Sequence, residues 1–156
     1  MIVSVDFDGT CVTHEFPNTG KNIGAEIVLK ALVDEGHEII CLSMRSEEHK
    51  ETCGVDTIQG IKDWFSSHGI ELFAINDHPG QETWSKSRKV YASTYIDDQF
   101  LGCPLKIYKT YSYKPFVDWL IVAVILQKRG FLSIEVFDKV KKELEEKYPE
   151  LYLHKN

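Results

Sequence analysis

Short apolar runs that end at polar residues recur along the chain and alternate with stretches of helical periodicity. The first run, 2–5, is rich in β-branched residues and stops at an acidic residue, which is typical of a strand buried on both faces. Similar runs lie at 39–42, 70–75 and 93–96. Strands that alternate with helices predict a parallel sheet covered by helices on both faces. The expected fold class is therefore α/β, a three-layer αβα sandwich.

The segments between these runs carry helix start and stop signals. Asn22 can cap a helix whose apolar residues recur at three and four positions, and Gly36 supplies its end. Asp56, with Gln59 three residues later, resembles a capping box for a second helix that ends at Gly69. Further along we expect a short polar helix at 85–89, a weak strand at 105–108, a helix or strand from Pro115 to Gln127, and a helix capped by Ser133. This order predicts a Rossmann-like sandwich with a central parallel sheet.

The length of 156 residues suits one domain, and a hydrophobic content of 43% is enough to build a core. We find no repeat, linker or low-complexity stretch, so the predicted domain is 1–156, with its motifs in 2–105 and helices at 115–148 packing on the sheet. The longest apolar run, 119–126, is far shorter than the roughly 20 residues of a membrane-spanning helix. The N-terminus has no signal-peptide pattern, and the four cysteines show no metal or disulfide spacing, so we expect a cytoplasmic protein with reduced thiols and no membrane partner.

The net charge of −6 argues against a protein that coats nucleic acid, because such binding depends on cations that meet phosphates. One segment, from Lys106 to Lys114, nevertheless interleaves lysines with tyrosines, as a platform for single strands would. A loop at the edge of the sheet explains the same pattern, and the acidic total favours the loop. Nucleic acid stays open as a partner without being favoured.

Polar side chains follow the apolar runs at the points where the strands should end. Asp6 and Asp8 follow the first run, Ser43 follows the second, and Asp97 and Asp98 follow the fourth. Ligands of open parallel sheets bind at the carboxyl ends of the strands, so we expect these side chains to converge. Carboxylates that converge repel one another, and the usual remedy is a hard divalent cation with oxygen ligands. The sequence therefore predicts a Mg²⁺ site.

The same residues can act on a phosphate. One carboxylate of the first pair could attack phosphorus, while the other handles the proton of the leaving group. Lys89, which precedes the acidic pair, could neutralise a phosphate oxygen, and Ser43 could donate a hydrogen bond to it. Lys86 is an alternative to Lys89, although it lies three residues further from the strand.

These residues, in this order, resemble the four motifs of the haloacid dehalogenase-like (HAD) hydrolase superfamily. The motifs are Asp6-Phe7-Asp8-Gly9-Thr10, Ser43 after its apolar run, Lys89, and Tyr95-Ile96-Asp97-Asp98, and the resemblance covers about 2–105. It is to a small branch of bacterial and phage members without a cap domain. The resemblance implies a phosphomonoester phosphatase in which Asp6 forms an aspartyl-phosphate and Asp8 acts as general acid and then base.

The resemblance also implies roles for the remaining residues of the motifs. Ser43 and Lys89 would hold the transferring phosphoryl group. Magnesium would be bound by Asp6, by the main-chain carbonyl of Asp8, and by Asp97, with Asp98 bound directly or through water.

Arg45, in Ser43-Met44-Arg45-Ser46, is similar to the arginine of a Thr-Gly-Arg segment that lies near the site in relatives. On this resemblance it would join the phosphate-binding residues, and an arginine on a surface loop is the alternative. The six histidines show no ligand spacing and are expected on the surface or in the core.

The spacing of the motifs leaves no room for a cap domain, because the loop, helices and strands already account for the chain between Asp8, Ser43 and Lys89. An open site implies a large substrate, a partner subunit that closes it, or loose selectivity set by loops such as 13–22 and 47–53. The alternatives to a small-molecule phosphatase are a polynucleotide end phosphatase or nucleotidase, and a non-catalytic HAD-like binding or regulatory module. A phospho-receiver domain fits less well, because receivers place their lysine last. The final residues, 150–156, could be a tail or an oligomer contact.

Overall fold

The computed structural model describes residues 1–153 and contains a central sheet of four parallel strands in the order β3-β2-β1-β4. The strands are β1 (Ile2–Val5), β2 (Glu38–Cys41), β3 (Leu72–Ile75) and β4 (Thr94–Ile96). In the middle strand, Val5 pairs with Cys41 on one side and with Ile96 on the other. The predicted α/β fold with a parallel sheet is therefore confirmed.

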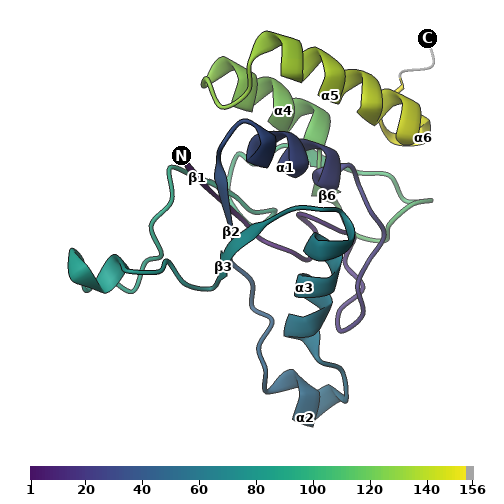
Figure 1. The fold of residues 1–156 in the computed structure, drawn as a ribbon. Helices are drawn as coiled ribbons and strands as arrows, with labels where there is room; N and C mark the ends of the chain where they lie inside the picture. Colours follow the sequence, from purple (N-terminus) through teal and green to yellow (C-terminus); the bar gives the residue numbers. More distant parts are fainter. Residues whose placement is uncertain (154–156) are drawn as a thin grey trace.

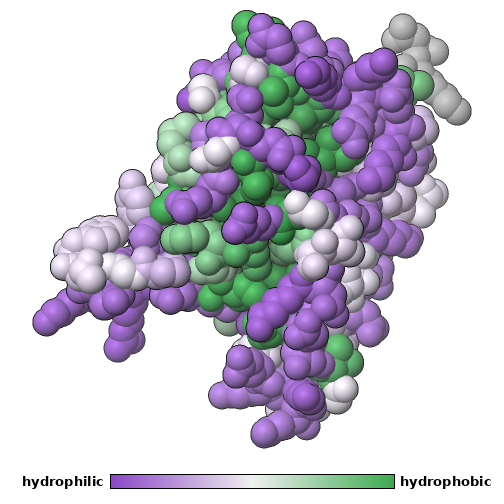
Figure 2. Space-filling view, viewed as in Figure 1, coloured by the Kyte–Doolittle hydropathy of each residue, from purple (hydrophilic) through white to green (hydrophobic). Residues whose placement is uncertain are grey.

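Helices cover both faces of this sheet (Figure 1). The first face carries α1 (Ala25–Asp34), α4 (Trp119–Lys128) and α5 (Ile134–Lys147), and the other carries α3 (Thr57–Ser67). Two helices are short, α2 (His49–Cys53) and α6 (Pro149–Tyr152). Figure 2 shows hydrophilic residues over most of one side of the molecule, with apolar patches between them. Among residues 1–153, none of the helices has the length and apolar character needed to cross a bilayer.

The helix cap predicted for Asp56 is confirmed, whereas the cap predicted for Asn22 is not. The Asp56 side chain accepts the main-chain N–H of Gln59 and begins α3 as expected. Asn22 does not cap α1, which begins after Gly24, a residue in the left-handed region at φ +95°. The side chain of Asn22 instead accepts the indole N–H of Trp64 in α3. A contact across the fold has replaced the local cap.

The segment at 85–89, predicted as a helix, has no regular secondary structure. It follows a 3-10 turn, η1 (Gln81–Thr83), in an arm that projects from the body of the protein (Figure 1). The amide of Gln81 donates to the carbonyls of Ser87 and Lys89 and accepts the N–H of Tyr91. The side chain of Gln81 thus forms hydrogen bonds with main-chain groups of this segment, in place of the bonds within a helix.

The segments after the fourth strand differ from the prediction in detail. The weak strand is shorter, β5 (Leu105–Lys106), and pairs antiparallel with β6 (Phe116–Val117) apart from the central sheet. The helix expected from residue 115 begins at Trp119, where the side chain of Asp118 caps it. Of the expected tail, Leu151 and Tyr152 are buried in α6, whereas 154–156 lie outside the described residues.

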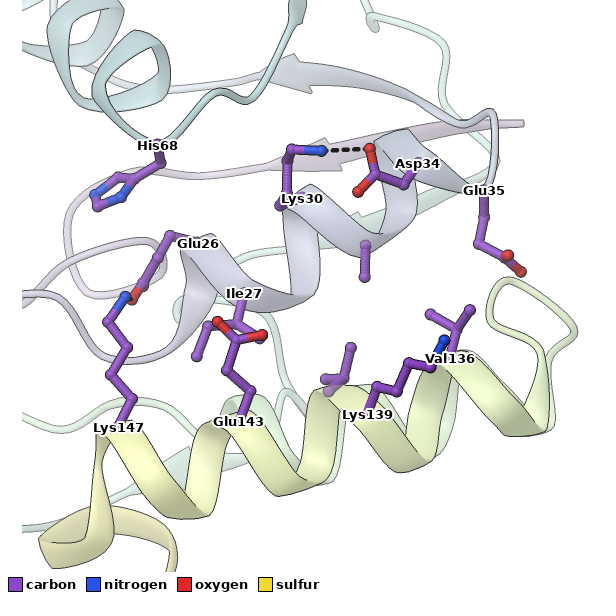
Figure 3. Close-up of a pocket in the computed structure, with 12 residues that line it drawn as sticks. Glu26, Ile27, Lys30, Asp34, Glu35, His68, Val136, Lys139, Glu143 and Lys147 are labelled. Atoms are coloured by element: carbon purple, nitrogen blue, oxygen red, sulfur yellow. Dashed lines mark hydrogen bonds and ion pairs between the residues drawn. The ribbon is translucent and has the colours of Figure 1, made fainter.

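The C-terminal helices dock on α1 through a buried carboxylate. A groove of about 410 Å³ separates α1 from α5 (Figure 3), and Glu26 of α1 points toward Lys147 of α5 at one end of it. Glu26 is only 4% exposed; its Oε1 accepts the hydroxyl of Tyr148 and lies 3.0 Å from Nζ of Lys147. Burial and the bond to Glu26 raise the pKa of Tyr148. The hydroxyl of Tyr148 therefore stays a donor to this carboxylate.

Replacing Tyr148 by phenylalanine should lower the free energy of unfolding by about 1–3 kcal/mol, because the buried carboxylate of Glu26 loses a donor. Urea denaturation monitored by circular dichroism measures the change. Tyr113→Phe is the matched control, since Tyr113 is largely exposed and should shift stability by less than about 0.5 kcal/mol. Equal stabilities of the two variants would contradict the role given to Glu26.

Candidate functional site

The polar residues that close the strands meet in one cleft at the carboxyl edge of the sheet. The main-chain N–H of Asp6 donates to Ile96 at 2.9 Å, and that of Leu42 donates to Val5 at 2.8 Å, so the ends of β1, β2 and β4 stay in register. The cleft has a volume of about 470 Å³. It is lined by Asp6, Asp8, His14, Phe16, Ser43, Met44, Arg45, His49, Asp97, Asp98 and Gln99.

Three carboxylates lie together on the floor of this cleft. Asp6, Asp97 and Asp98 each offer an oxygen, and these oxygens all lie within 4.8 Å of one another. Thr10 joins the two acidic segments, since its buried hydroxyl accepts the N–H of Asp98 at 3.0 Å and donates to Asp6 at 3.4 Å. The sequence motifs at 6–10 and 95–98 are thereby held as one unit.

The electrostatics of this cluster favour a cation. Burial raises the pKa of Asp6 to about 7, with further contributions from the negative charges of Asp97, Asp98 and Asp8; the N–H of Phe7 opposes the rise. A carboxylate that is hard to ionise beside two others gains most from a bound positive charge. The donor set is all oxygen, which suits Mg²⁺. The three aspartates therefore fit the predicted metal.

The guanidinium of Arg45 is paired within the protein. Its Nε and Nη2 donate to both carboxylate oxygens of Asp8 at 2.7 and 2.8 Å. The remaining N–H groups donate to the main-chain carbonyls of Asn18, Pro17 and Thr57. A guanidinium has five N–H donors, and all of them are used. The guanidinium is thus engaged by Asp8 and by main-chain carbonyls, and the phosphate-binding role of Arg45 stays a prediction. The alternative of a surface arginine is wrong, because Arg45 is buried.

The ion pair with Arg45 positions the side chain of Asp8. The resemblance assigns to Asp8 a main-chain contact with the metal and a proton-transfer role for its side chain. Its carboxylate stands outside the cluster of three and is oriented by Arg45. The carboxylate of Asp8 is thus engaged by Arg45, and the contact of its main-chain carbonyl with the metal stays a prediction of the resemblance.

Ser43 lies in the cleft in a position to donate. Its main-chain N–H is bound by the side chain of Asn76, and its Oγ accepts the N–H of Arg45 at 3.2 Å. The hydroxyl hydrogen of Ser43 is then available to an oxygen in the cleft.

The structure does not bring Lys89 to the carboxylates. Lys89 lines a separate concavity of about 310 Å³ in the projecting arm, and its Nζ lies 4.9 Å from the ring centre of Tyr95. Gln81 holds the main chain of Lys89 against η1, which explains the placement. The alternative, Lys86, does not line the cleft either. The expected convergence of Lys89 with the carboxylates is therefore not found, and its phosphate-binding role stays a prediction.

Two residues that hold predicted site residues in place, His14 and Asn76, were not expected from the sequence. His14, expected on the surface or in the core, places its Nε2 3.2 Å from a carboxylate oxygen of Asp98 that also accepts from Gln99. Asn76 follows β3 with φ 54° and binds Ser43. Asn76 could have been found, because it closes an apolar run like the other strand-end residues. His14 carries no such signal beyond its place in the loop after the first motif.

The segment with alternating lysines and tyrosines does not line the cleft. Lys106 places its Nζ 3.0 Å from the carboxylate of Asp118, and the hydroxyl of Tyr111 donates to the carbonyl of Asn22. Tyr113 remains largely exposed. Part of the segment is thus used in internal contacts, and nucleic-acid binding there stays a prediction.

The fold and the cleft define an α/β protein with an acidic cluster at the carboxyl edge of a parallel sheet. No family model matches the chain, and none of the curated proteins matches it. A solved structure, that of a conserved protein coded by a locus from Bacteroides thetaiotaomicron, is 30% identical and covers 83% of this chain and 91% of its own, with a TM-score of 0.62. The chain belongs to the same family as that conserved protein.

Proposed function

We propose that the protein is a Mg²⁺-dependent phosphohydrolase that cleaves phosphomonoesters through an aspartyl-phosphate at Asp6. The supporting observation is the cluster of Asp6, Asp97 and Asp98 at the carboxyl edge of the sheet. Ser43 and the oriented carboxylate of Asp8 complete the cleft. The resemblance of the motifs to HAD hydrolases without a cap domain supports the same activity.

In the proposed reaction, a carboxylate oxygen of Asp6 attacks phosphorus and the bond from phosphorus to the ester oxygen breaks. The departing oxygen takes the bond electrons and a proton from Asp8. Water then attacks the phosphorus of the aspartyl-phosphate, Asp8 accepts its proton, and phosphate leaves with Asp6 restored. Because Arg45 donates to both oxygens of Asp8, it fixes the orientation of this carboxyl group in the cleft.

In this proposal Asp6, Asp97 and the main-chain carbonyl of Asp8 would hold Mg²⁺, with Asp98 bound directly or through water. The ion would supply positive charge against the negative charge of the transferring phosphoryl group. The hydroxyl of Ser43 would donate to a phosphate oxygen. Two other cations of the sequence stay out of this proposal, since Arg45 is fully paired and Lys89 lies in the arm.

We expect phosphate release from phosphorylated metabolites, nucleotides or a 3′-phosphorylated oligonucleotide to require Mg²⁺ and to fall at least about 10³-fold in Asp6→Asn. Asp138→Asn, on the exposed side of α5, is the matched control and should keep wild-type activity. A phosphate assay with and without a chelator measures both effects. Full activity of Asp6→Asn, or activity without metal, would refute the mechanism. Metal binding without any turnover would instead favour a non-catalytic module.

A further inference from the structure

The carboxylate cleft is lined by two apolar side chains and an imidazole in addition to its acidic residues. These are Phe16, Met44 and His49, which we call the ring wall. Phe16 is 50% exposed and Met44 is 92% exposed, although both are large and apolar. The ring of Phe16 meets the ring of His49 edge to face, with their centres 5.0 Å apart. Apolar surface therefore faces the same space as the acidic cluster.

The ring wall is fixed in place by the residue that holds Asp8. The guanidinium of Arg45 lies between two rings, 4.9 Å from the centre of Phe7 and 5.5 Å from that of Phe16. Arg45 also donates to the carbonyl of Pro17, the next residue in the loop that carries Phe16. The position of the Phe16 ring is thus tied to the carboxylate of Asp8.

His49 is oriented as well. Its Nδ1 accepts the main-chain N–H of Ser46 and lies 3.1 Å from the hydroxyl of Thr57. A neutral imidazole that accepts at Nδ1 carries its hydrogen on Nε2. The ring wall consequently combines apolar surface with one N–H donor.

The size of the cleft indicates what such a wall would contact. About 470 Å³ lies within the range of small-molecule sites, roughly 300–1,000 Å³, and is more than a phosphate group alone needs. The carboxylates on the floor would hold the metal that binds the substrate's phosphate. The ring wall is then free to contact the rest of the substrate. Aromatic surfaces of this kind bind planar rings by stacking or edge contacts.

We propose that the ring wall binds a planar ring of the substrate, so that the favoured substrates are phosphomonoesters whose alcohol carries such a ring, as nucleoside monophosphates do. This inference rests on the proposed phosphohydrolase activity and names its substrate class. The chemistry at phosphorus is unchanged, and the ring contact adds affinity shared by the ground state and the transition state.

Adenosine 5′-monophosphate and ribose 5-phosphate provide a matched test, because they present the same phosphate ester and differ in the ring. We expect kcat/KM to be about tenfold or more higher for the nucleotide, the scale of one base contacting an aromatic side chain. In Phe16→Ala the kcat/KM for the nucleotide should fall by clearly more than that for ribose 5-phosphate, so that the two values approach each other. Phe73→Ala, a partly exposed phenylalanine on β3, is the control and should keep the wild-type ratio.

The outcomes separate this inference from the proposed function. Equal kcat/KM values for the two compounds, or a preference that persists in Phe16→Ala, overturn the inference and leave the phosphohydrolase standing. Hydrolysis of neither compound counts against the proposed function, and calorimetric Kd values for the same pair with Asp6→Asn then decide the ring contact on their own. Tighter nucleotide binding that disappears in Asp6→Asn/Phe16→Ala supports it, and equal Kd values overturn it.

Discussion

Replacing Arg45 by methionine is expected to lower the free energy of unfolding by about 3 kcal/mol or more. The substitution keeps a long apolar side chain between Phe7 and Phe16, so packing changes little. It leaves the carboxylate of Asp8 without its paired charge and three main-chain carbonyls without their donor. Removing one partner of a buried ion pair costs more than the pair is worth, because the other charge stays behind. Denaturant unfolding measures the loss.

Three variants sharpen this prediction. Arg45→Lys keeps the charge but cannot donate to both oxygens of Asp8, so it should recover only part of the stability. Asp8→Asn/Arg45→Met removes the unpaired charge and should be more stable than Arg45→Met alone, a coupling that a double-mutant cycle resolves. Arg88→Met, on the exposed surface of the arm, should shift stability by less than about 0.5 kcal/mol. A wild-type stability for Arg45→Met would reject the pairing.

The second large effect concerns the metal-free protein, whose stability should fall as the pH rises from about 4 to 7. The pKa of Asp6 is about 7 in the folded protein against 3.8 ordinarily, so the folded state holds the proton more tightly than the unfolded state. Between these two values the unfolded state binds fewer protons, and the free energy of unfolding therefore decreases with pH. The difference in pKa corresponds to at most about 4 kcal/mol, fully lost above pH 7.

Asp6→Asn should abolish this part of the pH dependence and make the metal-free protein more stable than wild type at pH 8. Thermal unfolding at pH 5 and pH 8, compared between the variant and wild type, isolates the contribution of Asp6 from other titrating groups. Mg²⁺ added at pH 8 should stabilise wild type and have little effect on the variant. A difference between variant and wild type that is the same at both pH values would rule out the raised pKa of Asp6.

Much of the fold follows from local signals in the chain. The run at 2–5 is short and mainly β-branched, the run at 93–96 contains Thr94 and Ile96, and the structure places β1 and β4 within them. Asp56 caps α3 because its partner lies three residues away. The convergence of Asp6, Asp97 and Asp98 follows in turn, since parallel strands end at one edge of the sheet.

Sequence alone thus determined the parallel α/β fold and the acidic cluster, because both depend on periodicity and on which residue ends each strand. Only the tertiary structure decided how the cations are used. Arg45 and Lys89 stand near the motifs in sequence, yet one is enclosed by carbonyls and Asp8, and the other is held in the arm by Gln81. His14 reaches Asp98 across 84 positions of the chain. The contacts of Arg45 and His14 join segments that are distant in sequence, so no local pattern records them.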